Sequence, residues 1–489
     1  MQRYKIYLPF LFLLIIITSC KKDFLEVNNP NLITKDFNVI DLATTSNYMT
    51  GIYVNVAQDL FIYGAITGYP EVIADNLKPV TSTSSIFSPH YSWIQSSSKG
   101  FSNPLSTTNV NKFWLNGYGI LHSCTFLVEK AEEYRGENPV KADDLKAQAL
   151  TLKAYVNFLL VNIFAQSYNY TADASHPGIP IVTNSDWSLP INSRQTVKED
   201  YDQMVADLNT AISLFQPTSP SVFYMNKNAA KGLLARVYLF KGDYAAAKNL
   251  AREVGTAVPI MQASANGYPS KLFTDKESEA LFQLAPSQGG LSLPSPNGSY
   301  TGTFNTNYLG VLFVSPKYFI ATNDIANILT QNPSDLRKSW ISGTAGAYNV
   351  SKYPQGVITG FTTASASYYQ TLLRSSEMYL TAAEAYAKIS NEDSSRYYLN
   401  QIRTRAGLFS LTNTISGSGL LDSIYLERRR ELCFEGLRMF DLLRWKKGVD
   451  RADAWTATVK SLPYPSNKAI APLPQQDVDM YQISQNEDY

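Results

Sequence analysis

Hydrophobic residues recur with the period of an α-helix along most of this chain. Apolar side chains three and four positions apart share one face of a helix and favour helices over strands. The pattern predicts helices over residues 41–60, 111–134, 143–165, 197–215, 228–241, 244–254, 374–389, 394–405 and 422–446. In the third of these, Asp143 and Asp144 are expected in the first turn, where acidic side chains complement the helix dipole. The fold is therefore expected to be mainly α.

One predicted helix pair has the spacing of a tetratricopeptide unit. The residues that carry this spacing are Ala235, Tyr238, Gly242, Tyr244, Ala247 and Pro259. A small residue at Ala235 lets the two helices approach, Gly242 turns the chain, and Pro259 ends the unit. One unit cannot bury its own face, so several helix pairs must stack into a scaffold. The alternative is an isolated helical hairpin that matches by chance.

Three long polar stretches interrupt the helices, at residues 79–110, 286–309 and 344–369. Loops of this length are uncommon in compact domains and are usually functional or disordered. These three contain tyrosine, phenylalanine or tryptophan, which disordered segments generally lack. We therefore expect ordered excursions that pack on the helical scaffold.

The N-terminus has the pattern of a secretory signal. Arg3 and Lys5 precede an apolar run over residues 10–17, and Cys20 follows directly after Thr-Ser. The run is shorter than the ~20 residues that span a bilayer. Residues 17–20 resemble a bacterial lipobox, so residues 1–19 are predicted to be removed and Cys20 to be lipidated. Residues 20–38 are expected to form a tether; an ordinary signal with a chance cysteine is the alternative.

Composition excludes several common function classes. Lys and Arg total 42 against 41 for Asp and Glu, a net charge of +1 that does not favour nucleic-acid binding. The chain has no CxxC, HExxH, GxSxG or GxxxxGK[ST] motif, so no cofactor or metal is predicted, although a structural calcium stays open. Cys124 and Cys433 are expected to be buried free thiols rather than a disulfide.

The segment from Glu427 to Trp445, which reads ERRRELCFEGLRMFDLLRW, is the most distinctive in the chain. It resembles the signature helix of the SusD/RagB family of outer-membrane nutrient-binding lipoproteins. Further stretches resemble family segments in the same order: CKKDFL at 20–25, GIPIV at 178–182, LTAAEA at 380–385, LNQIRTRAGL at 399–408 and IAPLP at 470–474. The resemblance thus covers nearly the whole chain. The chain departs from the family at Leu121–Cys124, where an Asn is frequent, and at Glu487–Asp488, where Pro-Gly is frequent.

The resemblance implies tetratricopeptide-like helix pairs with long irregular ligand-binding loops, in a single SusD-like domain over residues 39–489. We expect a helical scaffold at about 39–78, 111–260 and 371–450, a loop-rich binding portion at about 79–110 and 261–370, and a C-terminal tail at 451–489.

The resemblance also implies a noncatalytic receptor, lipid-anchored in the outer membrane and exposed on the cell surface. Such a receptor captures an oligosaccharide, or a peptide, and passes it to a SusC-like TonB-dependent transporter. A lipid-anchored glycan hydrolase and a helical-repeat scaffold for protein partners are the alternatives.

The loops hold the chemistry that a sugar ligand requires. An aromatic ring covers the apolar C–H face of a sugar, and amide and carboxylate groups bond its hydroxyls. The candidate ligand-binding residues are Trp93, Tyr300, Tyr91, Phe304, Tyr308, Asn305 and Asp75, with Asn307 and Asn76 beside them. The alternative is that the rings pack the loops onto the scaffold.

The signature segment also carries charged residues in a regular pattern. Glu427, Glu431, Glu435, Arg438 and Asp441 are 4, 4, 3 and 3 positions apart and would share one face of a continuous helix. Acids next to arginine could serve a glycosidase, but a structural ion-pair network is favoured. Trp445 is expected in the scaffold.

Overall fold

The computed structural model describes residues 39–57, 64–81, 87–97, 109–186, 193–216, 221–284, 317–353 and 369–489. The predicted signal, lipidation site and tether lie outside these residues. So do Tyr300, Phe304, Asn305, Asn307 and Tyr308 of the second long loop.

The described chain is mainly helical, which confirms the expected fold class. The longer helices are α3 (Leu42–Asn55), α6 (Asn109–Glu133), α7 (Pro139–Phe164), α8 (Val197–Leu214), α9 (Lys227–Lys241), α10 (Tyr244–Ala257), α13 (Ser375–Lys388), α14 (Glu392–Arg405) and α15 (Gly417–Leu432). The shorter helices are α4 (Gly68–Val72), α5 (Ser88–Tyr91), α12 (Asn323–Thr330), α16 (Arg438–Arg444) and α17 (Gln475–Tyr481), with 3-10 turns η4 (Leu336–Trp340), η6 (Ala457–Val459) and η7 (Asn467–Ala469).

The strands are short and pair two by two. They are β1 (Leu77–Pro79), β2 (Ala280–Leu284), β3 (Phe319–Ala321), β4 (Ile341–Ser342), β5 (Asn349–Val350), β6 (Gln370–Arg374), β7 (Val449–Asp450) and β8 (Ser461–Leu462). The antiparallel pairs are β1–β3, β2–β6, β4–β5 and β7–β8. The portion expected to be loop-rich therefore also contains α12 and the β4–β5 hairpin.

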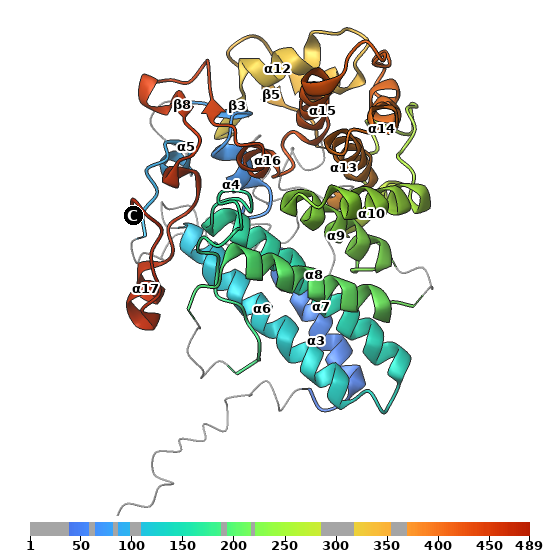
Figure 1. The fold of residues 1–489 in the computed structure, drawn as a ribbon, viewed down its shortest axis with the longest axis vertical. Helices are drawn as coiled ribbons and strands as arrows, with labels where there is room; N and C mark the ends of the chain where they lie inside the picture. The colour runs from blue at the N-terminus through green and yellow to red at the C-terminus, as the bar shows by residue number, and fades with distance from the viewer. Residues whose placement is uncertain are drawn as a thin grey trace, which may run out of the picture.

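The helices stack along the chain, each against the next. Helices α6, α7 and α8 lie side by side with α3 in the lower half of Figure 1, and α9, α10, α13 and α14 continue the stack above them. The C-terminal tail, with β8 and α17, runs down one side of this stack (Figure 1). The C-terminal tail, which contributes to the candidate site, therefore lies along one side of the stacked helices.

Helix α7 begins four residues earlier than the pattern predicts. The Asn138 side chain accepts a hydrogen bond from the backbone N–H of Lys141, and Pro139 occupies the first turn. Asp143 and Asp144 therefore lie beyond the first turn, and the dipole interpretation of these acids was wrong. Helix α7 is long and apolar enough to cross a membrane, but 94% of that apolar window is buried inside the protein.

The tetratricopeptide-like pair is present as α9 and α10. Helix α9 ends at Gly242, whose φ of +81° is a left-handed conformation that glycine adopts without strain. Asp243 then caps α10 by accepting a hydrogen bond from the N–H of Ala246. Ala235 and Ala247 are fully buried, as expected for small residues between packed helices.

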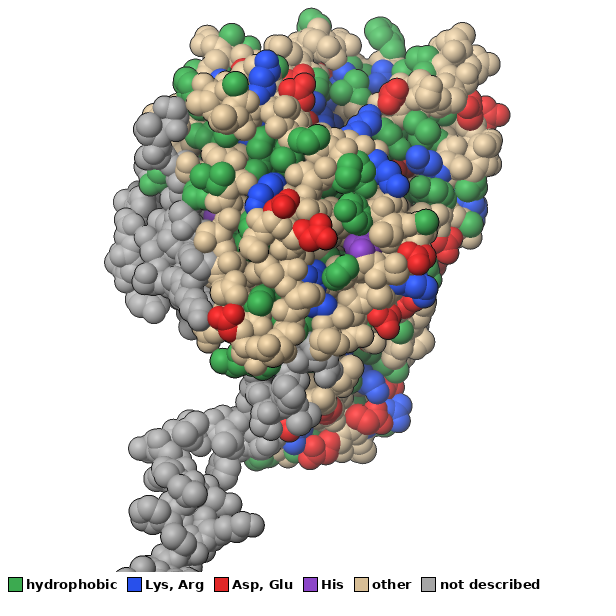
Figure 2. All heavy atoms as spheres, turned by 60° about the vertical axis from the view of Figure 1, so that its left-hand side comes forward, with side chains coloured by type: hydrophobic (Ala, Val, Ile, Leu, Met, Phe, Trp, Pro, Cys, Tyr) green, Lys and Arg blue, Asp and Glu red, His purple; other side chains and the backbone are tan. Residues whose placement is uncertain are grey.

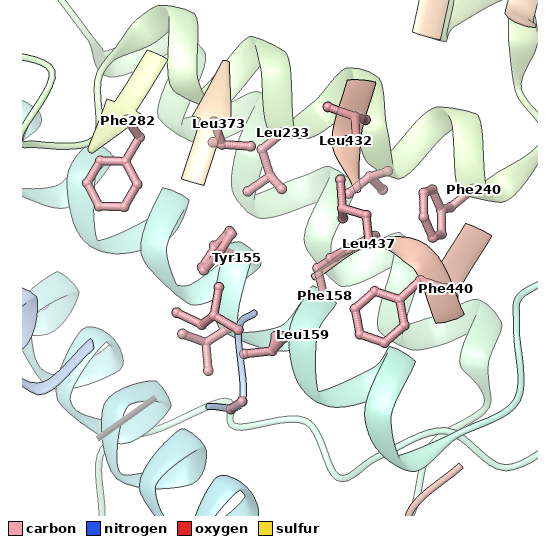
Figure 3. Close-up of a cluster of buried hydrophobic side chains, with 14 of the residues drawn as sticks. Tyr155, Phe158, Leu159, Leu233, Phe240, Phe282, Leu373, Leu432, Leu437 and Phe440 are labelled. Carbon is pink, nitrogen blue, oxygen red and sulfur yellow. The ribbon is translucent and has the colours of Figure 1, made fainter. Parts of the chain in front are cut away.

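The core between these helices is closely packed. Aromatic and aliphatic side chains from α7, α9, the β2–β6 ladder and the signature segment meet in one cluster (Figure 3). The Phe158 ring lies 4.9 Å from that of Phe240 and 6.4 Å from that of Phe440, edge-on in both cases. The cavity beside Phe158 measures about 20 Å³, enough for roughly one water. It is too small for a nutrient.

Cys124 and Cys433 are free and buried, which confirms the expectation for the thiols. Burial raises the pKa of each to about 12. Neither thiol is therefore ionised at neutral pH, and a reactive role is disfavoured.

The signature segment is not one helix, and the prediction of a continuous helix over 422–446 was wrong. Helix α15 ends at Leu432, and the chain turns through Phe434 and Gly436, with φ values of +67° and +86°, before α16 begins. A Cβ on Gly436 would come within 2.0 Å of the Ile66 carbonyl oxygen. The close approach of this turn to residue 66 explains why glycine is required there.

The charged residues of this segment are nevertheless paired, through contacts distant in sequence. Glu431 Oε1 lies 2.8 Å from Arg374 Nη1 and 2.7 Å from Arg405 Nη2, and its Oε2 accepts a hydrogen bond from the Tyr268 hydroxyl. Arg374 also binds Glu435, at 2.7 Å. Further buried pairs include Glu427 with Arg337, Arg403 and Arg430, Asp441 with Arg428 and Arg444, Arg444 with Glu384, and Arg236 with Glu377.

Burial alone would raise the pKa of Glu431, but the three guanidinium groups of Arg405, Arg374 and Arg337 lower it well below the usual range. The carboxylate is therefore ionised in the folded protein. Its pairs connect α15 to α14, β6 and η4.

Replacing Glu431 with Gln should destabilise the protein strongly, because three buried arginines would lose their shared carboxylate. We expect a loss of about 3–5 kcal/mol in the free energy of unfolding, measured by urea denaturation. Asp143→Asn is the control, since it breaks an exposed pair with Arg135 and should cost under about 1 kcal/mol. Equal losses in the two variants would contradict a special role for the buried network.

Glu277 should make stability depend on pH near neutrality. Burial, with a further contribution from Glu279, raises the pKa of Glu277 to about 8. Between its ordinary value of 4.5 and about 8, the folded state holds a proton that the unfolded state has lost, so stability falls as pH rises. Glu277→Gln should flatten this part of a urea-denaturation pH profile. Identical slopes in both proteins would contradict the assignment.

Candidate functional site

The β1–β3 ladder forms the common root of two of the predicted binding loops. Residue Lys78 pairs with Ile320, and the N–H of Val80 donates to the carbonyl of Tyr318 at 2.9 Å. The chain leaves β1 toward the first long loop and enters β3 from the second. The first loop therefore leaves the scaffold at this ladder, and the chain returns to it after the second loop.

Asp75 lies just before this ladder, and both of its carboxylate oxygens are engaged in ion pairs. Its two carboxylate oxygens each accept a hydrogen bond from Arg438, both at 2.7 Å, and Arg429 lies 3.5 Å away. Burial acts to raise the pKa of Asp75, but Arg438 and Arg429 lower it far more. Neighbouring Asn76 is committed as well, since it accepts from Arg429 and donates to Glu71. Asp75 is thus engaged in ion pairs in this structure, and its role as a ligand residue stays a prediction.

Tyr91 and Trp93 are buried, and in this conformation neither ring offers a face to a ligand. The Arg451 guanidinium lies over both, 3.8 Å from the Tyr91 centroid and 4.1 Å from that of Trp93. The Trp93 indole N–H donates to the carbonyl of Ile73 at 3.1 Å. Their placement matches the alternative interpretation, in which the aromatic rings pack the loop onto the scaffold.

Arg451 ties three segments together beneath the site. Its guanidinium donates to the carbonyls of Ala74, Tyr91 and Val72, at 2.7, 2.6 and 3.1 Å. Burial lowers the pKa of Arg451 to about 10, so the side chain remains charged at neutral pH. The start of the C-terminal tail is therefore held rigidly against the root of the first loop.

Trp455, four residues farther along this tail, presents an aromatic platform. Its side chain is 49% exposed, yet its indole N–H donates to the carbonyl of Pro79 at 2.8 Å. The Lys78 ammonium lies 5.4 Å from the ring centroid. A ring that is both exposed and held in one orientation can stack on a ligand at little cost in side-chain entropy.

Polar groups lie beside this ring. Asp453 Oδ2 is 3.0 Å from Lys78 Nζ and accepts a hydrogen bond from the N–H of Asn323 at 2.9 Å. Its second oxygen, Oδ1, has no hydrogen-bond partner within the described part of the chain. An aromatic face next to an acceptor and a cation is an arrangement suited to a sugar ring and its hydroxyls.

The described acids of the signature segment do not form a catalytic pair. A general acid needs a raised pKa, whereas Glu427, Glu431 and Glu435 are ion-paired with arginines that lower their pKa despite burial. In the described ranges there is also no cluster of three or more residues suited to hold a metal.

Trp455 was missed because it falls in the segment assigned as a tail. A lone tryptophan among small residues at 452–458, outside any amphipathic helix, was the available signal. The contact with Pro79 joins residues 376 positions apart, and no local pattern predicts it.

The comparisons agree with this architecture. Residues 298–489 match a family model described as the SusD family, and residues 23–239 match one described as starch-binding associating with outer membrane. A SusD-like protein P2 of Formosa agariphila is 24% identical over 385 residues, which cover 69% of this chain and 72% of the relative.

Solved structures show the same fold. A SusD superfamily protein of Bacteroides thetaiotaomicron aligns with a TM-score of 0.77 at 24% identity, covering 91% of this chain and 100% of its own. A SusD-like carbohydrate-binding protein of Bacteroides vulgatus aligns with a TM-score of 0.68 at 20% identity, covering 84% and 85%. The two family models together match most of the chain, and the curated relative and these folds agree with them. The chain is a member of the SusD/RagB family.

Proposed function

We propose that this protein is a cell-surface lipoprotein that captures an oligosaccharide and passes it to a SusC-like TonB-dependent transporter in the outer membrane. Membership of the SusD/RagB family supports a binding role, and one matched family model carries a starch-binding, outer-membrane description. The SusD-like relative from Bacteroides vulgatus is described as carbohydrate-binding.

The observation that carries the proposal is the fixed, half-exposed ring of Trp455. It lies at the root of the loops whose aromatic side chains were predicted to bind ligand. In the proposed site, the ring covers one sugar face, Asp453 bonds a hydroxyl at its edge, and the buried Lys78 holds the Asp453 carboxylate in place. Tyr300, Phe304, Asn305 and Tyr308, which lie outside the described residues, stay predicted ligand residues of the second loop.

The protein acts as a receptor and not as an enzyme in this proposal. The paired acids of the signature segment serve as structural anchors, and the ligand leaves chemically unchanged. Residues 39–489 form the single binding domain, and the tether at 20–38 joins it to the lipid on Cys20. The transporter receives the ligand when loops at the binding face move, since a few loop residues suffice for such a motion.

Replacing Trp455 with Ala should weaken oligosaccharide binding about tenfold, a loss of about 1.4 kcal/mol from one stacked ring. Calorimetric titration of full-length protein in detergent, with a panel of oligosaccharides and peptides, measures this change. Trp455→Phe should keep most of the affinity because a ring remains. Each mixture is then analysed for cleavage products, and none is expected.

Tyr397→Ala is the matched control, because Tyr397 is 59% exposed on α14 and lies outside the site. Its affinity should equal that of the unaltered protein. Unchanged affinity in Trp455→Ala would exclude the platform. Cleavage of an oligosaccharide would exclude a purely binding role, and selective peptide binding would change the nutrient class.

Replacing Cys20 with Ser should abolish lipidation, because the thiol is the acyl acceptor. Metabolic labelling of cells with a fatty-acid analogue should mark the unaltered protein and Cys124→Ser, but not Cys20→Ser. Label retained in Cys20→Ser would contradict the anchor assignment.

A further inference from the structure

A pocket of mixed polar and apolar lining opens between the segment that follows α7 and the C-terminal tail, and Trp455 does not line it. Its volume is about 290 Å³, close to the lower limit of about 300 Å³ for small-molecule sites. Its polar and aromatic lining includes Gln166, Tyr170, His176, Arg194, Asn467 and Glu487.

Gln166 lines this pocket and has an unsatisfied acceptor. The side chain is only 7% exposed, and its Nε2 donates to the carbonyl of Ser466 at 3.1 Å. Its Oε1 is buried without a hydrogen-bond partner among the described residues. A buried acceptor left unpaired is unfavourable, and a ligand hydroxyl would satisfy it.

Arg194 supplies donors on another wall. Its Nε donates to the Gly178 carbonyl at 2.7 Å, and its Nη1 and Nη2 donate to the carbonyls of Ser484 and Pro177 at 3.1 and 3.2 Å. A guanidinium has five N–H groups, so two remain for a ligand within the described contacts. The three backbone contacts hold the group in one position between the 177–178 segment and the tail.

Tyr170 supplies an aromatic wall. Its half-buried ring packs edge-on against the His176 imidazole, at a centroid distance of 5.2 Å. The imidazole is itself held, with Nδ1 2.9 Å from the Thr171 hydroxyl and Nε2 3.2 Å from the Gln166 carbonyl. Burial lowers the pKa of His176, so the imidazole adds no charge at neutral pH.

The charges around the pocket balance. Arg194 and Glu487 line it, Lys468 and Asp488 adjoin lining residues in the sequence, and Asn467 donates to the Glu487 and Asp488 carboxylates, at 3.2 and 3.1 Å. Lys468 binds the backbone carbonyl of Asp488. Figure 2 shows acidic and basic side chains scattered over the face that carries the tail, with no large area of one sign. A neutral ligand therefore fits better than an ion.

We propose that this pocket binds one neutral glycosyl unit, as a carbohydrate subsite separate from the Trp455 platform. Tyr170 would cover one face of the ring, Gln166 Oε1 would accept from a hydroxyl, and Arg194 would donate to another. The hydroxyls of a sugar both donate and accept hydrogen bonds, so a sugar can contact all three protein groups. An apolar molecule could contact only the aromatic ring. The subsite goes beyond the proposed function, since it needs neither the platform nor the transporter.

Glu487 and Asp488 give the rim a chemistry particular to this chain. The family pattern often has Pro-Gly at these positions, and proline would remove a backbone donor and carry no carboxylate. Here the two acids accept hydrogen bonds from Asn467, which lines the pocket together with Glu487. The position at which this chain differs from the family pattern thus contributes Glu487 to the lining of the proposed subsite.

Saturation-transfer NMR on the full-length protein in detergent tests the subsite, with methyl glycosides of glucose, galactose and mannose as probes. At least one should bind, with a dissociation constant on the order of 1 mM. Tyr170→Ala and Gln166→Leu should each weaken that binding about tenfold or more. Tyr170→Phe, which keeps the ring, and Tyr397→Ala should bind like the unaltered protein, and thermal midpoints confirm that all variants are folded.

Three results would overturn the subsite. One is the absence of saturation transfer from all three glycosides. Another is binding that Trp455→Ala abolishes and Tyr170→Ala leaves intact, because the signal would then belong to the platform. The third is selective binding of glucuronate over the neutral glycosides, because Arg194 would then act as an anion site. Loss of oligosaccharide binding in Trp455→Ala with glycoside binding retained would separate the two sites.

Discussion

The buried pairing of arginines with the carboxylates of the signature segment is the constraint on which the rest of the structure depends. Glu431 and Arg374 join α15 and the turn after it to α14, β6 and η4. A buried charge without a partner is strongly unfavourable, so each of these elements is held to one relative position. The many arginines in this segment therefore act as structural partners for distant acids.

The same network extends to the candidate site. Arg438 holds Asp75 at the start of β1, and Arg451 clamps the first loop and the tail beneath Trp455. Each contact joins residues more than 350 positions apart. The segments that meet beneath Trp455 have little regular secondary structure. Ion pairs and hydrogen bonds to backbone carbonyls hold them in place, so the platform is rigid.

The platform and the tail pocket present related chemistry on different supports. Each combines an aromatic ring, a carboxylate or amide with one oxygen that lacks a hydrogen-bond partner among the described residues, and a fixed cation: Trp455 with Asp453 and Lys78, and Tyr170 with Gln166 and Arg194. Both depend on the C-terminal tail. A segment without much secondary structure can therefore position ligand groups when buried arginines and backbone carbonyls fix it in place.

The sequence by itself determined the helical scaffold, the tetratricopeptide-like pair at Gly242 and the family, because periodicity, turn residues and ordered motifs are local properties. The sequence analysis placed the start of α7 too late, because Asn138 and Pro139 begin the helix before the acids. It also predicted one continuous signature helix, whereas the helix is interrupted by a turn at Gly436 that lies against residue 66. Only the tertiary structure decided that Asp75, Tyr91 and Trp93 are buried supports and that Trp455 is exposed. Burial and charge pairing depend on residues hundreds of positions away, which no local pattern encodes.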